Sequence, residues 1–253
     1  MPKTVCIISD LHCGHKVGLC PPSHFPSSKK PEGVIARRLW NEFEKIVPRG
    51  CDILIVNGDA IDGKGERSGG CEQITTDRDE QADMAAEVIR YVGAEAVVVI
   101  AGTPYHTGQD EDWEKGIAKD VGAIKFGSHE TIRVEGVDFD VKHFVPGSQV
   151  PHGRHTAIAR DRLWEGLWAE YEERRRADVI VRSHVHYHSF CGGPGWLALT
   201  TPALQGLGSK YGSRKCMGIV DFGLTVFECN KGEYKWEARC KRIAEQQRKP
   251  VSL

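Results

Sequence analysis

The stretch Lys3-Thr-Val-Cys-Ile-Ile-Ser-Asp-Leu-His12 leads an apolar run directly into an aspartate and a histidine. Its apolar residues do not alternate with polar ones, which predicts a strand over Lys3–Ser9 that is buried on both faces. The same arrangement returns at Ile53–Gly63, where Ile53-Leu-Ile-Val56 runs into Asn-Gly-Asp-Ala-Ile-Asp-Gly63. Both stretches therefore predict a buried strand that ends in potential ligand or catalytic side chains.

The residues around these two stretches predict alternating strands and helices. Apolar residues recur at helical spacing over Val34–Val47 and over Asp79–Val92, and Val97–Ile100 is a third buried strand. Residues 13–33 are rich in Pro, Gly and Ser, which is typical of an irregular loop. The first hundred residues thus have the β-α-β-α-β order of a layered α/β fold.

The second half of the chain has a different pattern, with a hairpin and further strands. Thr131–Lys142 alternates apolar and polar residues around Gly136, as a β-hairpin does. Arg160–Arg176 has the pattern of a helix, in which we expect Trp164 and Trp168 to lie in the core. Further strands are expected at Asp178–Ser183, Trp196–Thr200, Met217–Glu228 and Tyr234–Arg239. We therefore expect an α/β fold with a two-sheet β-sandwich core flanked by helices, in one domain over residues 1–253.

Composition excludes several classes of protein. The 34 Lys and Arg against 35 Asp and Glu give a net charge of −1, so the chain has no globally basic surface for nucleic acid. No apolar run approaches the ~20 residues that span a membrane, and the first residues do not resemble a secretory signal. The nine cysteines form no CxxC pair, which argues against a zinc finger or a disulfide framework. We expect a cytoplasmic protein with no membrane partner.

Aspartates and histidines follow five of the expected strands. Because the carboxyl ends of strands meet at one edge of an α/β sheet, loops there converge on a shared site. In Asp10-x-His12 the strand period of two is expected to place both side chains on one side of the chain, and His184-x-His186 repeats this spacing. Imidazole with carboxylate favours Mn, Fe or Zn over Ca or Mg. Two such ions about 3.5 Å apart would suit displacement at phosphorus.

These motifs, in their order along the chain, resemble those of the calcineurin-like metallophosphoesterases. That family carries D-x-H, G-D-x-x-D, G-N-H, a lone H and G-H-x-H. Here the corresponding segments are Asp10-Leu-His12, Gly58-Asp-Ala-Ile-Asp62, Gly102-Thr-Pro-Tyr-His106, His143 and Ser183-His-Val-His186. The resemblance spans residues 5–186 and implies a four-layer αββα fold.

The resemblance also implies a binuclear metal site. One ion would be held by Asp10, His12, Asp59 and His186, and the second by Asp59 as a bridge together with His143 and His184. Manganese is the ion we expect first, with iron, zinc or nickel as alternatives. The nucleophile would be a water or hydroxide between the ions, because a metal lowers the pKa of bound water towards ~7.

The chain departs from the family pattern at its third motif. Thr103 stands where the family has an asparagine ligand of the second metal, and a hydroxyl is a poorer ligand than an amide oxygen. Pro104 and Tyr105 separate Thr103 from His106, the candidate general acid for the leaving alkoxide. Asp62 resembles the family acid that orients this histidine.

The expected function is a metal-dependent phosphoesterase. The Ser183-His-Val-His186 ending resembles phosphodiesterase and nuclease branches, so we expect a phosphodiester substrate in nucleic acid or a nucleotide. Arg154 and His155 could contact the phosphate, although a solvated loop explains them equally well. A phosphomonoesterase is the alternative, and a catalytically impaired binding module on the same scaffold is an alternative of another class. The sequence identifies no protein partner.

Overall fold

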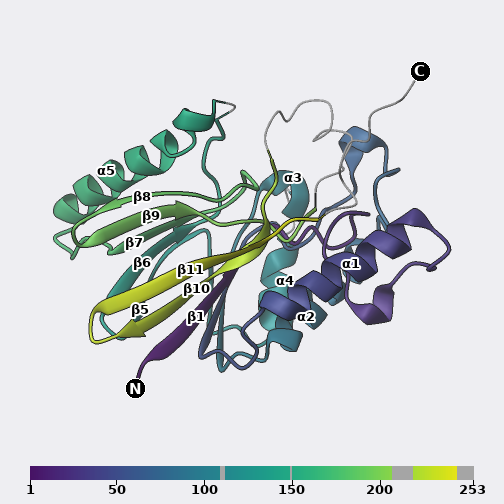
Figure 1. The fold of residues 1–253 in the computed structure, drawn as a ribbon, viewed down its shortest axis with the longest axis horizontal. Coiled ribbons are helices and arrows are strands. Elements are labelled where there is room, and N and C mark those ends of the chain that lie inside the picture. The colour runs from purple at the N-terminus through teal and green to yellow at the C-terminus, as the bar shows by residue number, and fades with distance from the viewer. Residues whose placement is uncertain (109–111, 149, 207–218, 244–253) are drawn as a thin grey trace.

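Two β-sheets packed face to face, with helices on both outer sides, form the protein in a computed structural model that describes residues 1–108, 112–148, 150–206 and 219–243 (Figure 1). The layers follow the order helix, sheet, sheet, helix. This architecture confirms the α/β, two-sheet fold that the sequence predicts.

The first sheet has six strands in the order β11-β10-β1-β2-β3-β4. Strands β1 to β4 run parallel to one another, whereas β10 pairs with β1 antiparallel and forms a hairpin with β11. The strands are β1 (Lys3–Ile8), β2 (Ile53–Asn57), β3 (Ala96–Ile100), β4 (Lys125–Gly127), β10 (Phe222–Asn230) and β11 (Glu233–Lys241).

The second sheet has five strands in the order β5-β6-β7-β9-β8. Its first two strands form the predicted hairpin, and β6, β7 and β9 are parallel. The strands are β5 (His129–Val134), β6 (Val137–Lys142), β7 (Val179–Arg182), β8 (Ser189–Gly193) and β9 (Trp196–Thr200).

The helices cover the outer faces of the two sheets. Three pack on the six-stranded sheet: α1 (Pro31–Ile46), α2 (Arg78–Val92) and α4 (Trp113–Asp120). The longest helix on the other side, α5 (Thr156–Tyr171), lies on the five-stranded sheet (Figure 1). Short helical segments complete the fold: α3 (Pro104–Thr107) and 3-10 turns at Pro22–His24, Glu66–Ser68 and Pro151–Gly153.

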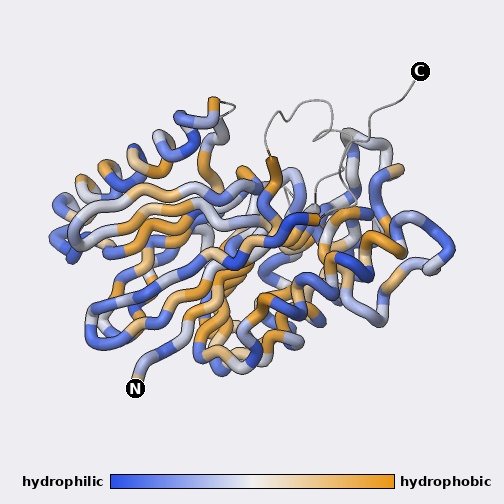
Figure 2. The backbone as a smooth tube through the Cα atoms, in the orientation of Figure 1, coloured by the Kyte–Doolittle hydropathy of each residue, from blue (hydrophilic) through white to orange (hydrophobic). Residues whose placement is uncertain are grey.

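Apolar side chains on β1 alternate between two cores, because successive residues of a strand point to opposite faces. Val5 and Ile7 face the second sheet, whereas Cys6 and Ile8 face the helices. Figure 2 shows apolar residues concentrated along the central strands. Between the sheets, the rings of Phe139 and Phe227 meet edge to face at 5.0 Å. Burial on both faces explains the unbroken apolar runs in the sequence.

Three sequence predictions were wrong in detail. Strand β10 begins at Phe222; Met217 and Gly218, where the strand was expected to begin, lie outside the described residues. Helix α5 ends at Tyr171 because Glu173 adopts a left-handed backbone conformation and the Arg174 N–H donates to the carbonyl of Ala169, a Schellman-type ending.

The third error concerns Trp164 and Trp168, which lie on the exposed side of α5 instead of in the core. Helix α5 is apolar on both sides, so its sequence pattern does not indicate which side faces the sheet.

Across the described residues, no helix combines the length and hydropathy needed to cross a membrane. The eight cysteines within those residues are all free thiols.

Candidate metal centre

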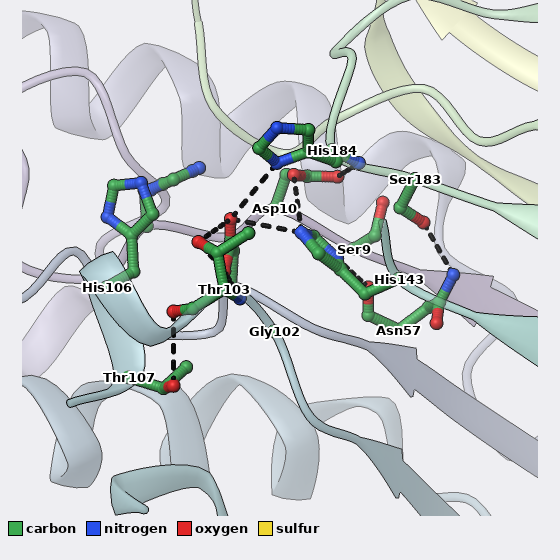
Figure 3. A network of polar contacts seen from close by, with 12 residues as sticks. Ser9, Asp10, Asn57, Gly102, Thr103, His106, Thr107, His143, Ser183 and His184 are labelled. Atoms are coloured by element: carbon green, nitrogen blue, oxygen red, sulfur yellow. Dashed lines mark hydrogen bonds and ion pairs between the residues drawn. The ribbon is translucent and has the colours of Figure 1, made fainter. Parts of the chain in front are cut away.

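The loops that follow β1, β2, β6 and β7 meet at one edge of the sandwich. Asn57 ends β2, and its side-chain amide donates to the Ser183 hydroxyl beyond β7 at 2.7 Å. Thr201, which follows β9, lies 2.7 Å from the hydroxyls of both Ser183 and Ser9. These buried hydroxyls connect the ends of the two sheets next to the candidate ligands, and Figure 3 shows Ser9, Ser183 and Asn57 beside His143. Ser9 and Thr201 were not singled out by sequence reasoning, because isolated hydroxyl residues after a strand carry no spacing signal.

The candidate ligands stand in turns with left-handed backbone conformation. The φ angles are 50° at Asp10, 45° at His12, 50° at Asp59, 72° at His184 and 56° at His186. Non-glycine residues rarely adopt such angles, and they gather at sites where the surrounding structure holds them. The strand-period argument for Asp10-x-His12 and His184-x-His186 is therefore wrong: both pairs lie beyond their strands, and turns bring their side chains together.

Two glycines allow the loops to approach this closely. Gly58 has φ of +79°, and a Cβ there would lie 2.4 Å from Nδ1 of His143. A Cβ on Gly102 would lie 2.2 Å from the backbone nitrogen of Asp59. A side chain at Gly58 would displace His143, and one at Gly102 would displace Asp59, so the close approach of these loops requires glycine at both positions.

The first cluster joins Asp10, His12 and His186. The Asp10 Oδ1 atom lies 3.1 Å from Nε2 of His186, and the Nε2 atoms of the two histidines are 3.2 Å apart. The Nδ1 atom of His12 faces the Asp62 carboxylate at 2.9 Å, so that Nδ1–H donates and the Nε2 lone pair points into the cluster.

The second cluster joins Asp59, His143 and His184. The Asp59 Oδ2 atom lies 3.1 Å from Nε2 of His143 and 3.9 Å from Nδ1 of His184. Nδ1 of His143 donates to the carbonyl of Asn57 at 2.7 Å, which again directs Nε2 into the cluster. The Nε2 atom of His143 is also 3.9 Å from Asp10, so the two clusters adjoin (Figure 3).

The donor set fits divalent ions. Among the residues that the structure describes, three buried ligand atoms make no hydrogen bond of normal geometry: Oδ1 of Asp10, Nε2 of His143 and Nδ1 of His184. The first two instead have the ion-pair contacts at 3.1 Å described above. Buried polar atoms without such a bond are costly unless something else satisfies them. Mixed carboxylate and imidazole donors suit transition-metal ions, so each cluster could hold one.

The electrostatics of the site keep its aspartates ionised. Burial alone would raise the pKa of Asp10 and of Asp59, but the neighbouring histidines outweigh it and lower both. Burial also opposes protonation of His143, yet the charge of Asp59 raises its pKa to about 10. For His12, burial and the nearby His106 lower the pKa to about 4, so this imidazole is neutral with a free lone pair at pH 7.

Thr103 contacts the second cluster through Asp59. Its hydroxyl lies 3.0 and 3.2 Å from the two Asp59 carboxylate oxygens, and its backbone N–H donates to Oδ1 at 2.6 Å. The proton of the hydroxyl is thereby directed to Asp59. The oxygen of Thr103 nevertheless lies beside Asp59 of the second cluster (Figure 3).

His106 lies beside the first cluster on the short helix α3. Its ring meets that of His12 edge to face, with centroids 4.5 Å apart. Nδ1 of His106 lies 2.8 Å from the backbone carbonyl of Asp62 and 3.6 Å from its carboxylate. Asp62 therefore holds His106 mainly through its backbone, while its carboxylate contacts His12. The turn of α3 brings His106 back to the site despite the two intervening residues.

Glu114 on α4 is a buried acid that sequence reasoning missed. Its carboxylate accepts hydrogen bonds from the backbone N–H of Ala60 at 2.7 Å and of Gly102 at 2.5 Å. Burial, with the charge of Asp59, raises its pKa to about 8. Glu114 thus joins the loops that carry Asp59 and Thr103. No sequence signal distinguishes it from the exposed acids common in the first turn of a helix.

The two candidate substrate residues lie at the start of α5. The guanidinium of Arg154 stacks over the ring of Tyr187, 4.4 Å from its centroid, and Tyr187 directly follows His186. His155 is the exposed N-cap residue of α5 and makes no side-chain capping bond. Arg154 is thus linked to the loop of the first cluster, and His155 faces solvent.

Comparisons with known proteins found similarity of structure only. No family model and no curated protein sequence matches the chain. Among solved structures it is similar to Vps29 from Entamoeba histolytica complexed with Zn²⁺, at 15% identity and a TM-score of 0.45 over 94% of this chain and 98% of that one. It is also similar to Chaetomium thermophilum Vps29, at 9% identity and a TM-score of 0.47 over 94% of this chain and 97% of that one. A third similar structure is a novel archaeal phosphodiesterase, at 12% identity and a TM-score of 0.40 over 93% of this chain and 99% of that one. Similarity at this level indicates nothing about the activity of this chain.

Proposed function

We propose that this protein is a metal-dependent phosphoesterase that hydrolyses a phosphodiester in nucleic acid or a nucleotide. The observation that supports this most is the pair of adjoining clusters, Asp10-His12-His186 and Asp59-His143-His184, with buried ligand atoms that make no hydrogen bond of normal geometry. Asp59 would serve both ions, with Thr103 beside the second. Two divalent ions there, manganese first among them, would activate water and neutralise charge on the phosphate.

The chain's own residues would prepare the site for this reaction. Asp62 and the carbonyl of Asn57 fix the rings of His12 and His143, so that the Nε2 atom of each is directed inward, where a bound ion would displace the proton that Asp59 stabilises on His143. Two aspartates against two dications leave about +2, which attracts a phosphate anion. His106, held by the Asp62 carbonyl at 2.8 Å, would donate a proton to the leaving oxygen. Arg154 would contact the substrate phosphate.

The diester substrate is proposed from the chemistry of the motifs. The Ser183-His-Val-His186 ending resembles the phosphodiesterase and nuclease branches of the calcineurin-like metallophosphoesterases. A general acid is needed most when the leaving group is a poor one, such as the alkoxide of a sugar. The balanced net charge of −1 favours a short or single-stranded substrate over long duplex DNA, whose tight binding depends on neutralising many phosphates.

The test measures metal content and hydrolysis on the same preparation. Protein exchanged into manganese is expected to hold about two ions per chain and to hydrolyse bis-p-nitrophenyl phosphate faster than p-nitrophenyl phosphate. Asp59→Asn should lose the bound metal and the activity together, whereas Asp83→Asn, on the exposed side of α2, should keep both. Cleavage of a dinucleotide and a single-stranded oligonucleotide then defines the substrate.

Other outcomes assign the protein differently. Faster hydrolysis of the monoester would identify a phosphomonoesterase that uses the same site. Absence of bound metal and of turnover after manganese addition would contradict the proposal and favour a binding module.

A further inference from the structure

Helix α5 exposes an apolar stripe on the side that faces away from the five-stranded sheet. The stripe consists of Leu163, Trp164, Leu167, Trp168 and Tyr171, whose exposed fractions are 64%, 55%, 48%, 53% and 81%. The last four follow Leu163 by one, four, five and eight positions, a spacing that places all five along one face of the helix. Figure 1 shows α5 at the outside of the molecule.

The fold of the described chain uses the other side of α5. Ile158 packs in a small core with Ile180 of β7 and Ala198 of β9, and Ala169 is also buried. Glu165, on the same buried side, pairs with Arg162 and Arg174. The stripe therefore contributes little to packing within the described residues, although it holds both tryptophans of the helix.

The area of the stripe is close to what a stable interface requires. Tryptophan and tyrosine side chains can each bury 150–250 Å², so five side chains with these exposed fractions present roughly 600 Å². The largest apolar patch on a typical monomer is about 300–600 Å² and is often functional. A standard interface buries about 800 Å² on each partner, which the stripe and its polar rim together would supply.

We propose that the stripe is a homodimer interface, in which α5 packs antiparallel against α5 of a second copy about a twofold axis. Such an interface must be self-complementary, because the same surface serves both partners. Two charges beside the stripe meet this condition: exposed Arg160 lies near its N-terminal end, and exposed Glu170, whose contact within the chain is a surface pair with Arg176 at 3.7 Å, lies near its C-terminal end. In an antiparallel pair, each arginine approaches the glutamate of the other copy. A stripe rich in tryptophan and tyrosine is also typical of interface centres.

Sedimentation velocity over a wide concentration range tests the proposal. The wild-type chain is expected to be dimeric, and Leu167→Glu in the middle of the stripe should weaken dimerisation about 30-fold or more. Val34→Glu is the matched control, since Val34 is a half-exposed apolar residue of α1 away from the stripe. Circular dichroism and metal content establish that each variant is folded.

A charge exchange tests the antiparallel arrangement. Arg160→Glu and Glu170→Arg should each weaken the dimer, and the combined variant should restore it. A wild-type chain that stays monomeric at every concentration would overturn the proposal, and so would equal dissociation by Val34→Glu and Leu167→Glu. Monomers that bind lipid vesicles through the tryptophans would overturn it as well. Failure of the double variant to restore the dimer would exclude the antiparallel pairing.

Discussion

The hydroxyl of Thr103 lies within hydrogen-bond distance of both carboxylate oxygens of Asp59, at 3.0 and 3.2 Å, and the Thr103 N–H donates to Oδ1 at 2.6 Å. Thr103 is therefore a partner of the aspartate proposed to serve both metals. It stabilises the ionised form of Asp59 and orients its carboxylate. An asparagine at this position would offer a carbonyl oxygen, which is a stronger metal ligand than a hydroxyl.

Thr103→Asn is accordingly expected to tighten binding of the second ion by on the order of tenfold. Changes to residues that hydrogen-bond a metal ligand typically alter metal affinity by about 10- to 100-fold, and we expect the lower end of that range. Titration of metal-free protein with manganese, followed by calorimetry, measures the two binding steps separately. Thr103→Ser keeps the hydroxyl and serves as the control, with affinities close to wild type. If Thr103→Asn weakens the second step, the hydroxyl itself is the better partner for this site.

Glu114 is expected to support the metal centre without contacting an ion. Glu114→Gln places an amide where the carboxylate accepts two backbone hydrogen bonds, so one buried N–H of Ala60 or Gly102 loses its acceptor. Such a loss costs about 1–3 kcal/mol. For a chain of this size each kcal/mol lowers the Tm by about 2–4 °C.

Glu114→Gln should also affect metal binding, because the two backbone groups that Glu114 holds, Ala60 and Gly102, lie next to Asp59 and Thr103. Manganese affinity is expected to fall together with the Tm, and added metal should recover part of the lost stability. Glu228→Gln, at an exposed acid on β10, is the control for the same substitution at a site on the surface. A lower Tm with unchanged metal affinity would show that Glu114 stabilises the fold but does not position the ligands.

Much of the fold could be predicted because the central strands are buried on both faces. Unbroken apolar runs such as Val5–Ile8 and Ile53–Val56 identify such strands. The aspartates and histidines directly after these runs then indicate the edge of the sheet at which the site lies. The residues of the two clusters were singled out from their order along the chain. Strand ends and ligand-type residues are both local features, so the sequence displays them directly.

Other features depend on contacts between distant residues and leave no local signal. The left-handed turns at Asp10 and His184 arise from packing of two sheets, and Asp10 accepts from the His184 N–H at 3.3 Å across 174 positions. Glu114 reaches the site from a separate helix. For α5, both sides are apolar, so only the structure reveals that Trp164 faces outward.

The buried ion pair between Arg182 and Asp140 is expected to make stability depend on pH. Arg182 lies 2.7 Å from Oδ1 of Asp140, and His129 lies 2.8 Å from Oδ2. Burial tends to raise the pKa of Asp140, but the hydrogen bond from His129 and the charge of Arg182 lower it to about 2, against 3.8 for an ordinary aspartate. Because the folded-state pKa is depressed, the stabilisation is present above about pH 4 and is lost as the pH falls towards 2.

Asp140→Asn should therefore lower the free energy of unfolding by about 2 kcal/mol at pH 7, and by progressively less between pH 4 and pH 2. Urea unfolding at several pH values measures this difference. The matched control is Asp120→Asn, which removes the exposed pair with Arg90 and should change stability by less than about 1 kcal/mol. A difference that does not vary with pH would indicate lost packing instead of a lost charge.

His106 is expected to act on the leaving group and not on the metals. His106→Gln should lower turnover by about 10²–10⁴-fold on a substrate with a poor leaving group, such as a dinucleotide. The loss should be much smaller on bis-p-nitrophenyl phosphate, because nitrophenolate leaves without a proton. Bound manganese should stay close to the wild-type amount, since the ring of His106 is held by the Asp62 carbonyl, and its contact with the first cluster is the edge-to-face meeting with His12. His24→Gln, in the turn before α1, is the control for loss of an imidazole. Equal losses on both substrates would instead assign His106 to binding of the phosphate, and a fall in metal content would assign it to support of His12, whose ring it meets edge to face.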